Sequence, residues 1–110
     1  MPKVKAFSVF FTADDILDVE MQVEQGRIRE FKVNYRCRIA DVWHEAVRYD
    51  TEHGALHVHR FYLPLTREAR ALGRTKPANR DYTSQVQRAE ADLATNRKKY
   101  RSQMEAKLNG

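Results

Sequence analysis

The chain of 110 residues contains a single cysteine, Cys37. One thiol excludes an internal disulfide and does not supply the paired cysteines of a zinc finger. No stretch approaches the ~20 consecutive apolar residues of a membrane-spanning helix. No long apolar run of the kind found in a secretory signal follows the first residues. The sequence therefore predicts a cytoplasmic protein with a reduced thiol and no membrane partner.

Internal repeats and low-complexity tracts are also lacking, and glycine and proline are few, at four and three. The length suits one domain spanning residues 1–110, large enough for a single core of one sheet and a helix. Hydrophobic residues make up 42% and charged residues 32%, which is typical of a globular protein with a long solvated element. The net charge of +5 favours a polyanionic partner, with nucleic acid as the first candidate.

Apolar and polar residues alternate with a period of two over most of the first 63 residues, as expected for strands with one buried face. The pattern predicts an antiparallel meander of five strands over residues 4–63. The second and third strands are expected to pair Met21 with Phe31 and Val19 with Val33. A turn over residues 40–42 is expected to pair Ile39 with Trp43.

The fourth and fifth strands are predicted to form a hairpin around a four-residue loop, residues 51–54, with Gly54 at the position that needs a positive φ. The expected pairs are Val47 with Val58, Trp43 with Tyr62, and Tyr49 with Leu56. Apolar residues then face apolar residues at each of these positions, so the two valines are predicted to be buried partners.

Pro64 ends the last predicted strand, and the period then becomes helical. A short helix is expected over residues 66–73, capped by Thr66 and stopped by Gly73, followed by a linker over residues 74–79. A long amphipathic helix is expected over residues 81–108, on one thin apolar stripe: Val86, Ala89, Leu93, Tyr100, Met104 and Leu108. The predicted fold class is therefore α+β. Because the stripe is thin, we expect the residues after Arg97 to project from the domain or to pair with a second chain.

The predicted sheet gathers titratable groups on its polar face. The third strand contributes Lys32, Asn34, Arg36 and Arg38; the fourth contributes His44, Ala46, Arg48 and Asp50; the fifth contributes His57, His59 and Phe61. Four interpretations of this face stay open from the residues alone: a solvated surface, a phosphodiester-cleaving site, a metal site that uses the His57-x-His59 spacing with His53 or Asp50, and a nucleic-acid-binding surface.

Cleavage of RNA without a metal needs a base, an acid and a cation, and histidine and arginine supply these groups near neutral pH. The candidate catalytic residues are His57, His59, Arg48 and Asp50. The candidate nucleic-acid-binding residues are Lys32, Arg36, Arg38 and His44. No cofactor and no bound metal are predicted. The predicted partners are RNA or another nucleic acid, and a protein or second copy that binds the C-terminal helix.

The run RYDTEHGALHVHRF, residues 48–61, resembles a core shared by small prokaryotic proteins of unknown function, built on RYD-x2-HG-x2-H-x-H. It is more loosely similar to the His-rich segment of TumE-type toxins of toxin–antitoxin pairs. The resemblance covers residues 48–59 and implies a small β-rich protein with an activity directed at nucleic acid. The leading hypothesis is thus a metal-independent ribonuclease-type toxin, and the alternative is a module that binds nucleic acid or protein without catalysis.

Overall fold

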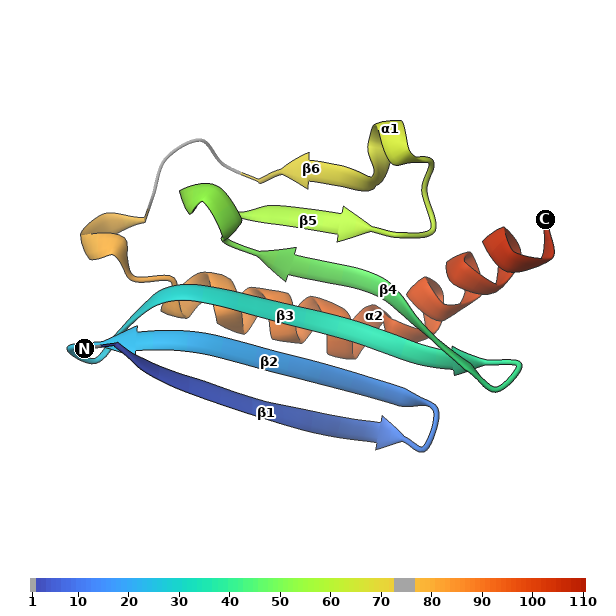
Figure 1. The fold of residues 1–110 in the computed structure, drawn as a ribbon, viewed down its shortest axis with the longest axis horizontal. Helices are drawn as coiled ribbons and strands as arrows, with labels where there is room; N and C mark the ends of the chain where they lie inside the picture. Colours follow the sequence, from blue (N-terminus) through green and yellow to red (C-terminus); the bar gives the residue numbers. More distant parts are fainter. Residues whose placement is uncertain (1, 73–76) are drawn as a thin grey trace.

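The structure, a computed structural model, describes residues 2–72 and 77–110, apart from the side chain of His53. Six strands form one antiparallel sheet in chain order (Figure 1): β1 (Lys3–Thr12), β2 (Asp15–Glu24), β3 (Arg27–Ile39), β4 (Val42–Asp50), β5 (His57–Arg60) and β6 (Ala69–Ala71). The helical segments are η1 (Glu52–Gly54), α1 (Leu65–Glu68), η2 (Ala78–Arg80) and α2 (Thr83–Asn109). The predicted α+β class, an antiparallel meander followed by a short and a long helix, is confirmed.

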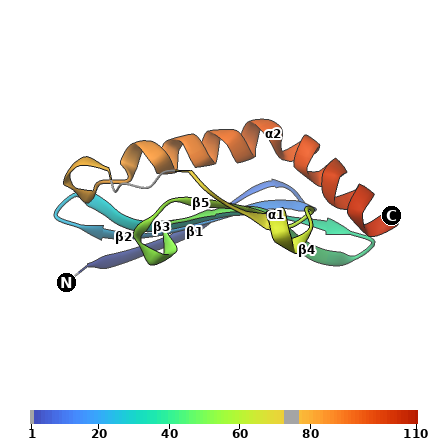
Figure 2. The same cartoon turned by 90° about the horizontal axis from the view of Figure 1, so that it is seen from above.

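The sheet has two faces of different character. Helix α2 lies across one of them, which we call the helix face, and it packs mainly on β3 and β4 (Figure 2). The core lies there, around Val33, Tyr35, Val47 and Leu93, all of them fully buried. The other side of the sheet, the open face, carries the intervening polar residues. The alternation of the strands therefore maps directly onto one packed and one solvated surface.

The predicted pairing of the second and third strands is confirmed. Met21 lies opposite Phe31 and Val19 opposite Val33. The connecting turn has two residues, Gln25 and Gly26, both with positive φ, and the register shifts by one residue near the turn. A turn of this kind matches the twist of the strands that it joins.

A second register shift, in β4, corrects the predicted position of two side chains. Tyr35 pairs with Val47 and Arg36 pairs with Glu45, so one extra residue bulges from β4 between Glu45 and Val47. Because the side-chain period is two, the bulge exchanges the faces of the residues before it. Trp43 thus lies opposite Arg38 on the open face, and His44 lies opposite Cys37 on the helix face. The expected pair of Ile39 with Trp43 is wrong, because Ile39 pairs with Val42.

The hairpin between β4 and β5 also differs from the prediction, by two residues. Tyr49 pairs with Val58 and Val47 with Arg60, so the connection runs over residues 51–56. Thr51 explains the longer loop, since its buried hydroxyl accepts a hydrogen bond from the Phe31 amide at 3.0 Å and its own amide donates to the Phe31 carbonyl. A shift of two residues keeps each side chain on its face, so Val47 and Val58 are both buried although they are not direct partners.

The segment after β5 folds into more sheet and less helix than expected. Helix α1 begins at Leu65, right after Pro64, and ends at Glu68; Thr66 lies inside it and does not cap it. Residues 69–71 then form β6, with Ala71 opposite His57, and the Leu72 amide donates to the Leu56 carbonyl. The expected stop at Gly73 and the first half of the expected linker lie outside the described residues. The pair of Trp43 with Tyr62 is wrong, because β5 ends at Arg60.

Helix α2 stays on the sheet beyond Arg97, in contrast to the expectation that its end projects. Met104 is buried in the core. The Arg101 guanidinium donates to the Arg38 carbonyl at 2.9 Å, and the Lys107 ammonium donates to the Phe61 carbonyl. These hydrogen bonds hold the last turns of α2 on the domain, where the apolar stripe is thin.

No helix in the described ranges is long and apolar enough to cross a membrane.

Candidate functional site

The Arg-Tyr-Asp run of β4 divides its side chains between the two faces. Arg48 and Asp50 are on the open face, whereas Tyr49 points to the helix face and donates a hydrogen bond to the Asp92 carboxylate of α2 at 2.6 Å. Burial and the hydrogen bond to Asp92 raise the pKa of Tyr49, so it remains a neutral donor. Tyr49 therefore attaches the helix, and its two neighbours lie on the open face.

The Asp50 carboxylate is the centre of the open-face cluster. Asp50 is 5% exposed, and its Oδ2 atom lies 3.1 Å from Arg48 Nε and 3.1 Å from His59 Nε2. Its Oδ1 atom accepts the Glu52 amide of the following loop at 3.3 Å. A buried carboxylate with a guanidinium and an imidazole in contact fixes the orientation of both.

The two histidines of β5 lie side by side on the open face, with ring centroids 6.4 Å apart. His57 Nδ1 lies 2.9 Å from the Ala55 carbonyl oxygen, and a carbonyl can only accept, so Nδ1 is the donor in this contact. His59 uses Nε2 toward Asp50, which leaves its Nδ1. Each imidazole is thus held by one of its two ring nitrogens.

Aromatic rings extend the cluster at both ends. The Phe61 ring stacks on His59 with 5.9 Å between centroids, and the Arg48 guanidinium lies 5.2 Å from the same ring. Further along, Trp43 lies beneath the guanidinium groups of Arg36 and Arg38. Flat rings beside cationic groups are the surfaces on which nucleic-acid bases stack.

The predicted nucleic-acid-binding residues are only partly gathered. Arg36 is paired with Asp18 at 2.7 Å and Arg38 with Asp14 at 2.6 Å, so each has a carboxylate partner. Lys32 lies in register between Glu20 and Asp50. His44 is on the helix face and does not join the set. The open face is therefore of mixed charge.

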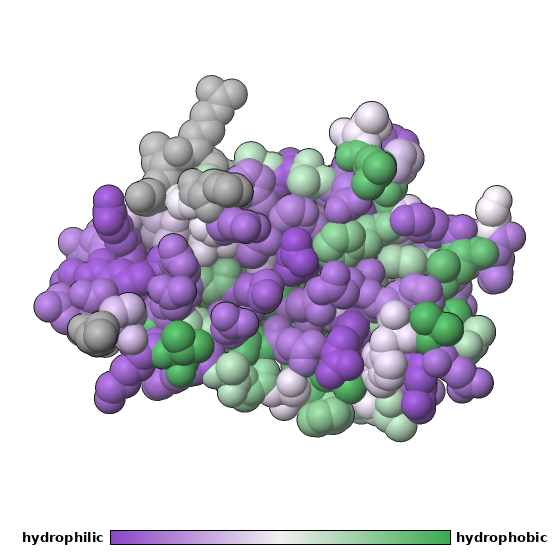
Figure 3. All heavy atoms as spheres, viewed as in Figure 1, coloured by the Kyte–Doolittle hydropathy of each residue, from purple (hydrophilic) through white to green (hydrophobic). Residues whose placement is uncertain are grey.

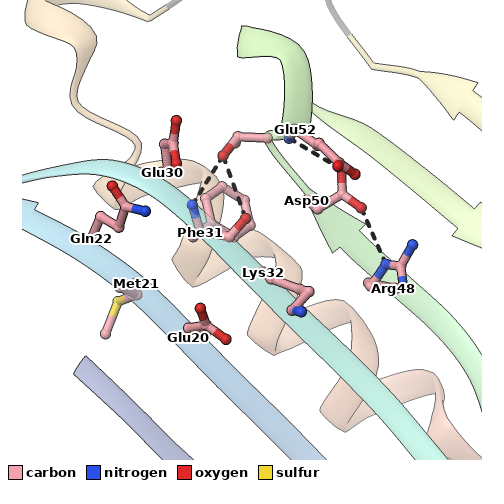
Figure 4. Close-up of a pocket in the computed structure, with 10 residues that line it drawn as sticks. Glu20, Met21, Gln22, Glu30, Phe31, Lys32, Arg48, Asp50 and Glu52 are labelled. Carbon is pink, nitrogen blue, oxygen red and sulfur yellow. Dashed lines mark hydrogen bonds and ion pairs between the residues drawn. The ribbon is translucent and has the colours of Figure 1, made fainter. Parts of the chain in front are cut away.

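A depression of 250 Å³ adjoins the cluster on the open face, between β2, β3 and the loop after β4 (Figure 4). Arg48 and Asp50 line it, together with Lys32 of β3 and Glu20 of β2. The histidines are not among its lining residues. Arg48 and Asp50 therefore belong both to the wall of the depression and to the cluster that contains the two histidines.

The metal interpretation has no geometric support in the part of the chain that the structure describes. There, no three His, Cys, Asp or Glu side chains are grouped closely enough to hold an ion. The side chain of His53, one of the candidate third ligands, lies outside the described residues.

Three residues that the candidate set omitted belong to the site. Glu45 contributes a carboxylate 3.7 Å from Arg48, Phe61 supplies the shared ring, and Thr51 ties the loop to β3. The bulge in β4 puts Glu45 on the open face, opposite Arg36, and this bulge leaves no mark in the sequence. The side-chain oxygen of Asn34, buried opposite Arg48, has no hydrogen-bond partner among the described residues. This oxygen could accept a hydrogen bond from a ligand beside the cluster.

The fold and the site together define a small α+β domain with one covered and one open sheet face, and with a His-, Arg- and Asp-containing cluster on the open one. The chain belongs to the family described as "Domain of unknown function (DUF7718)", which matches residues 1–110. No curated protein and no solved structure matches it.

Proposed function

We propose that the open-face cluster cleaves RNA without a metal, by attack of the 2′-oxygen on the adjacent phosphorus. His57 takes the 2′-OH proton on Nε2, and protonated His59 gives a proton to the departing 5′-oxygen from Nδ1. The products are a 2′,3′-cyclic phosphate and a 5′-hydroxyl. Arg48 stabilises the charge on the phosphorane oxygens, and Asp50 is a positioning residue that balances the His59 imidazolium.

The observation that carries the proposal is the pair of imidazoles 6.4 Å apart, each held through one nitrogen by its own acceptor. General acid–base cleavage needs two proton carriers that flank one phosphate with opposite protonation. Arg48 and Asp50 lie in the same cluster, next to the depression between β2 and β3.

The test incubates the purified protein with a short RNA between pH 5 and 8, in the presence of EDTA. Cleavage is expected, with a bell-shaped pH profile, because one imidazole has to be neutral and the other protonated. His57→Ala and His59→Ala should each abolish cleavage and leave the thermal stability nearly unchanged. His44→Ala is the matched control, because this histidine lies on the helix face and should retain full activity.

A substrate with deoxyribose at the cleaved position should remain intact, since it lacks the attacking hydroxyl. Arg48→Lys keeps the charge but loses the planar fork, so turnover should fall more than binding. RNA that stays intact over the whole pH range, or cleavage that EDTA abolishes, contradicts the proposal.

The RYD-x2-HG-x2-H-x-H core motivates a cellular form of the same proposal. A prokaryotic ribonuclease-type toxin acts in the cytoplasm, where RNA and a reduced thiol such as Cys37 occur together. Expression of the chain in bacteria should then arrest growth, and His57→Ala should relieve the arrest. Equal growth of bacteria that express the wild type and of those that express His57→Ala would contradict the toxin proposal. The cleavage assay would then still test the chemistry of the site.

A second candidate is a nucleic-acid-binding module without catalysis, favoured by where the charge lies. Residues 1–59 contain eight basic and ten acidic residues, whereas residues 60–110 contain twelve basic and five acidic ones. The positive excess therefore lies in residues 60–110, which include α2 and the segment before it. Contact with phosphates through this half of the chain needs no histidine pair.

A further inference from the structure

The two edges of the sheet are built very differently. Strand β6, at one edge, has three residues with an arginine in the middle, which is a short and charged edge of the kind that resists pairing with another chain. Strand β1, at the other edge, has ten residues, nine of them exposed and one half-buried (Figure 1). At ~3.3 Å per residue it offers about 33 Å of unpaired backbone.

Strand β1 also exposes large apolar side chains on both of its sides. Val4 is 63% and Phe10 69% exposed on the open face, and Phe7 and Val9 are exposed on the helix face. Hydrophobic residues accordingly appear along the margin of the molecule where β1 runs (Figure 3). Helix α2 packs on the central strands and reaches β1 at Phe11, where the Arg97 guanidinium lies 5.0 Å from the ring.

Edge strands are normally protected by a proline, charged residues or a bulge. In the described part of β1 such features lie at its ends: Lys3 and Lys5 at the start, and a register shift between Phe10 and Thr12. The five residues from 6 to 10 carry none of them. A long, apolar edge without protection is a template for another strand.

We propose that β1 pairs with β1 of a second copy of this chain, antiparallel and centred on Phe7, to join two sheets into one. This inference is independent of the proposed function, because β1 and the histidines of β5 lie at opposite sides of the sheet. The pairing is isologous, with a two-fold axis perpendicular to the sheet, so both α2 helices lie on the same side.

The sequence of β1 is self-complementary in this register. Val4 of one copy lies opposite Phe10 of the other, twice by symmetry, and Phe7 lies opposite its own counterpart. The two most exposed apolar residues of β1 thereby cover each other. Lys5 lies opposite Val9, whereas a parallel arrangement would put lysine against lysine, which is unfavourable. Shifting the centre to Ala6 or Ser8 would remove the pairs of Val4 with Phe10.

The resulting dimer would have a continuous twelve-stranded sheet, with short β6 strands at both ends. Stable interfaces bury more than about 1,000 Å² in total, and paired ten-residue strands with their phenylalanine side chains are at the lower end of this range. The two open faces would form one surface, with a His57–His59 pair near each end.

The first experiment measures the mass of the purified protein by light scattering over a concentration series. The wild type should have twice the mass of the 12.9 kDa chain. Phe10→Lys and Phe7→Lys, which put a charge on β1, should shift it to a monomer. Val42→Lys is the matched control, because Val42 is 54% exposed but lies at the hairpin between β3 and β4. It should remain a dimer.

Circular dichroism and thermal unfolding show whether each variant folds. Phe10 is so exposed that Phe10→Lys is expected to fold like the wild type. The proposal is overturned if the wild type remains a monomer up to ~1 mM, or if Phe10→Lys and Phe7→Lys remain dimers.

The second experiment tests the register by cross-linking. Residues directly opposite each other in antiparallel strands have Cβ atoms ~4.5–5.5 Å apart, so Phe7→Cys should form a disulfide-linked dimer under mild oxidation. The native Cys37 is fully buried and should not react. Val42→Cys is the control and should remain uncross-linked. An equal yield of cross-linked dimer from both variants would overturn the register.

Discussion

Arg101 joins three parts of the chain that are far apart in the sequence. Its guanidinium, on α2, donates to the Arg38 carbonyl at the end of β3 and lies 3.4 Å from the Asp15 carboxylate at the start of β2. Asp15 in turn accepts hydrogen bonds from the hydroxyls of Tyr35 and Thr12 at 2.5 and 2.6 Å. This network holds the C-terminal half of α2 on the sheet.

The network makes stability depend on pH through Asp15. Burial acts to raise the pKa of Asp15, but the hydrogen bonds from Thr12 and Tyr35 and the charge of Arg101 outweigh it, so the pKa is lowered. A lowered pKa in the folded state contributes stability that is present above the unfolded value of ~3.9 and is lost as the pH falls through the folded value.

We therefore expect Asp15→Asn to lower the free energy of unfolding at pH 7 by about 1–3 kcal/mol. It should also flatten the loss of stability below pH ~4. Urea unfolding from pH 2 to 7 measures both effects. Glu20→Gln, an exposed carboxylate on the same strand, is the control and should keep the acid-dependent slope. An equal slope in Asp15→Asn and the wild type would contradict this account.

At the scale of elements, α2 belongs to the core along its length. Val86, Ala89 and Leu93 are buried in its first half, and Met104 is buried near its end. The Asp92 carboxylate, next to Leu93, accepts hydrogen bonds from Tyr49 and Tyr100. The helix is thus attached by alternating apolar and polar contacts.

Truncation after Arg97 should consequently destabilise the domain. It removes Met104 from the core and Arg101 from Asp15, and a buried methionine alone is worth about 2–5 kcal/mol. Thermal unfolding of the truncated chain should show a large fall in Tm or loss of the cooperative transition. Removal of residues 109–110, which are exposed, is the control. A truncated chain with an unchanged Tm would show that α2 is dispensable beyond Arg97.

The hairpin between β3 and β4 carries strain at its turn. Ala40 and Asp41 have φ of 51° and 64°, and alanine has no side-chain hydrogen bond to favour this left-handed region. Ala40→Gly should therefore raise the free energy of unfolding by about 1 kcal/mol. Chemical denaturation measures it, and Ala13→Gly, in the turn before β2, is a control without a positive φ. A loss of stability in Ala40→Gly would contradict the assignment of strain.

The predictable and unpredictable parts of the fold differ for physical reasons. The pairing of β2 with β3 follows from apolar alternation and a short turn, which together put Met21 opposite Phe31 and Val19 opposite Val33. The bulge in β4 leaves no such mark, because Val42 replaces Trp43 opposite Ile39 and an apolar pair is kept. It moved His44 away from the candidate site and brought Trp43 to it. The cluster of Arg48, Asp50 and His59 was predictable, because a two-residue shift preserves the face.

At the scale of the whole molecule, the basic side chains of the open face and those of α2 differ in whether they have acidic partners. The arginines of the open face have carboxylate partners, whereas Lys98 and Lys99 of α2 are exposed in the basic half of the chain. An ion-paired arginine has to release its partner before it can bind phosphate, whereas an exposed lysine releases only counterions. The binding of nucleic acid, if it is electrostatic, should therefore depend on α2.

Binding of single-stranded RNA should weaken with salt, with a log–log slope of about −0.7 for each phosphate neutralised. Substitution of both Lys98 and Lys99 by alanine should reduce this slope by about 1.4, and Arg36→Ala should reduce it less. Titrations between low and physiological salt measure the slopes. A slope that is flat in the wild type, or that Arg36→Ala alone removes, would contradict binding through α2.

The central position of β3 has a consequence for how the native state opens. Its thirteen residues have a strand on each side and α2 above them, so their backbone hydrogen bonds break only when the neighbours separate. Strands β1 and β6 have one neighbour each and are exposed. Partial unfolding should then proceed inward from the two margins, with β3 as the last part to lose its order. The short strand β6 can detach without disturbing β3, whereas any opening that reaches β3 also releases the helix.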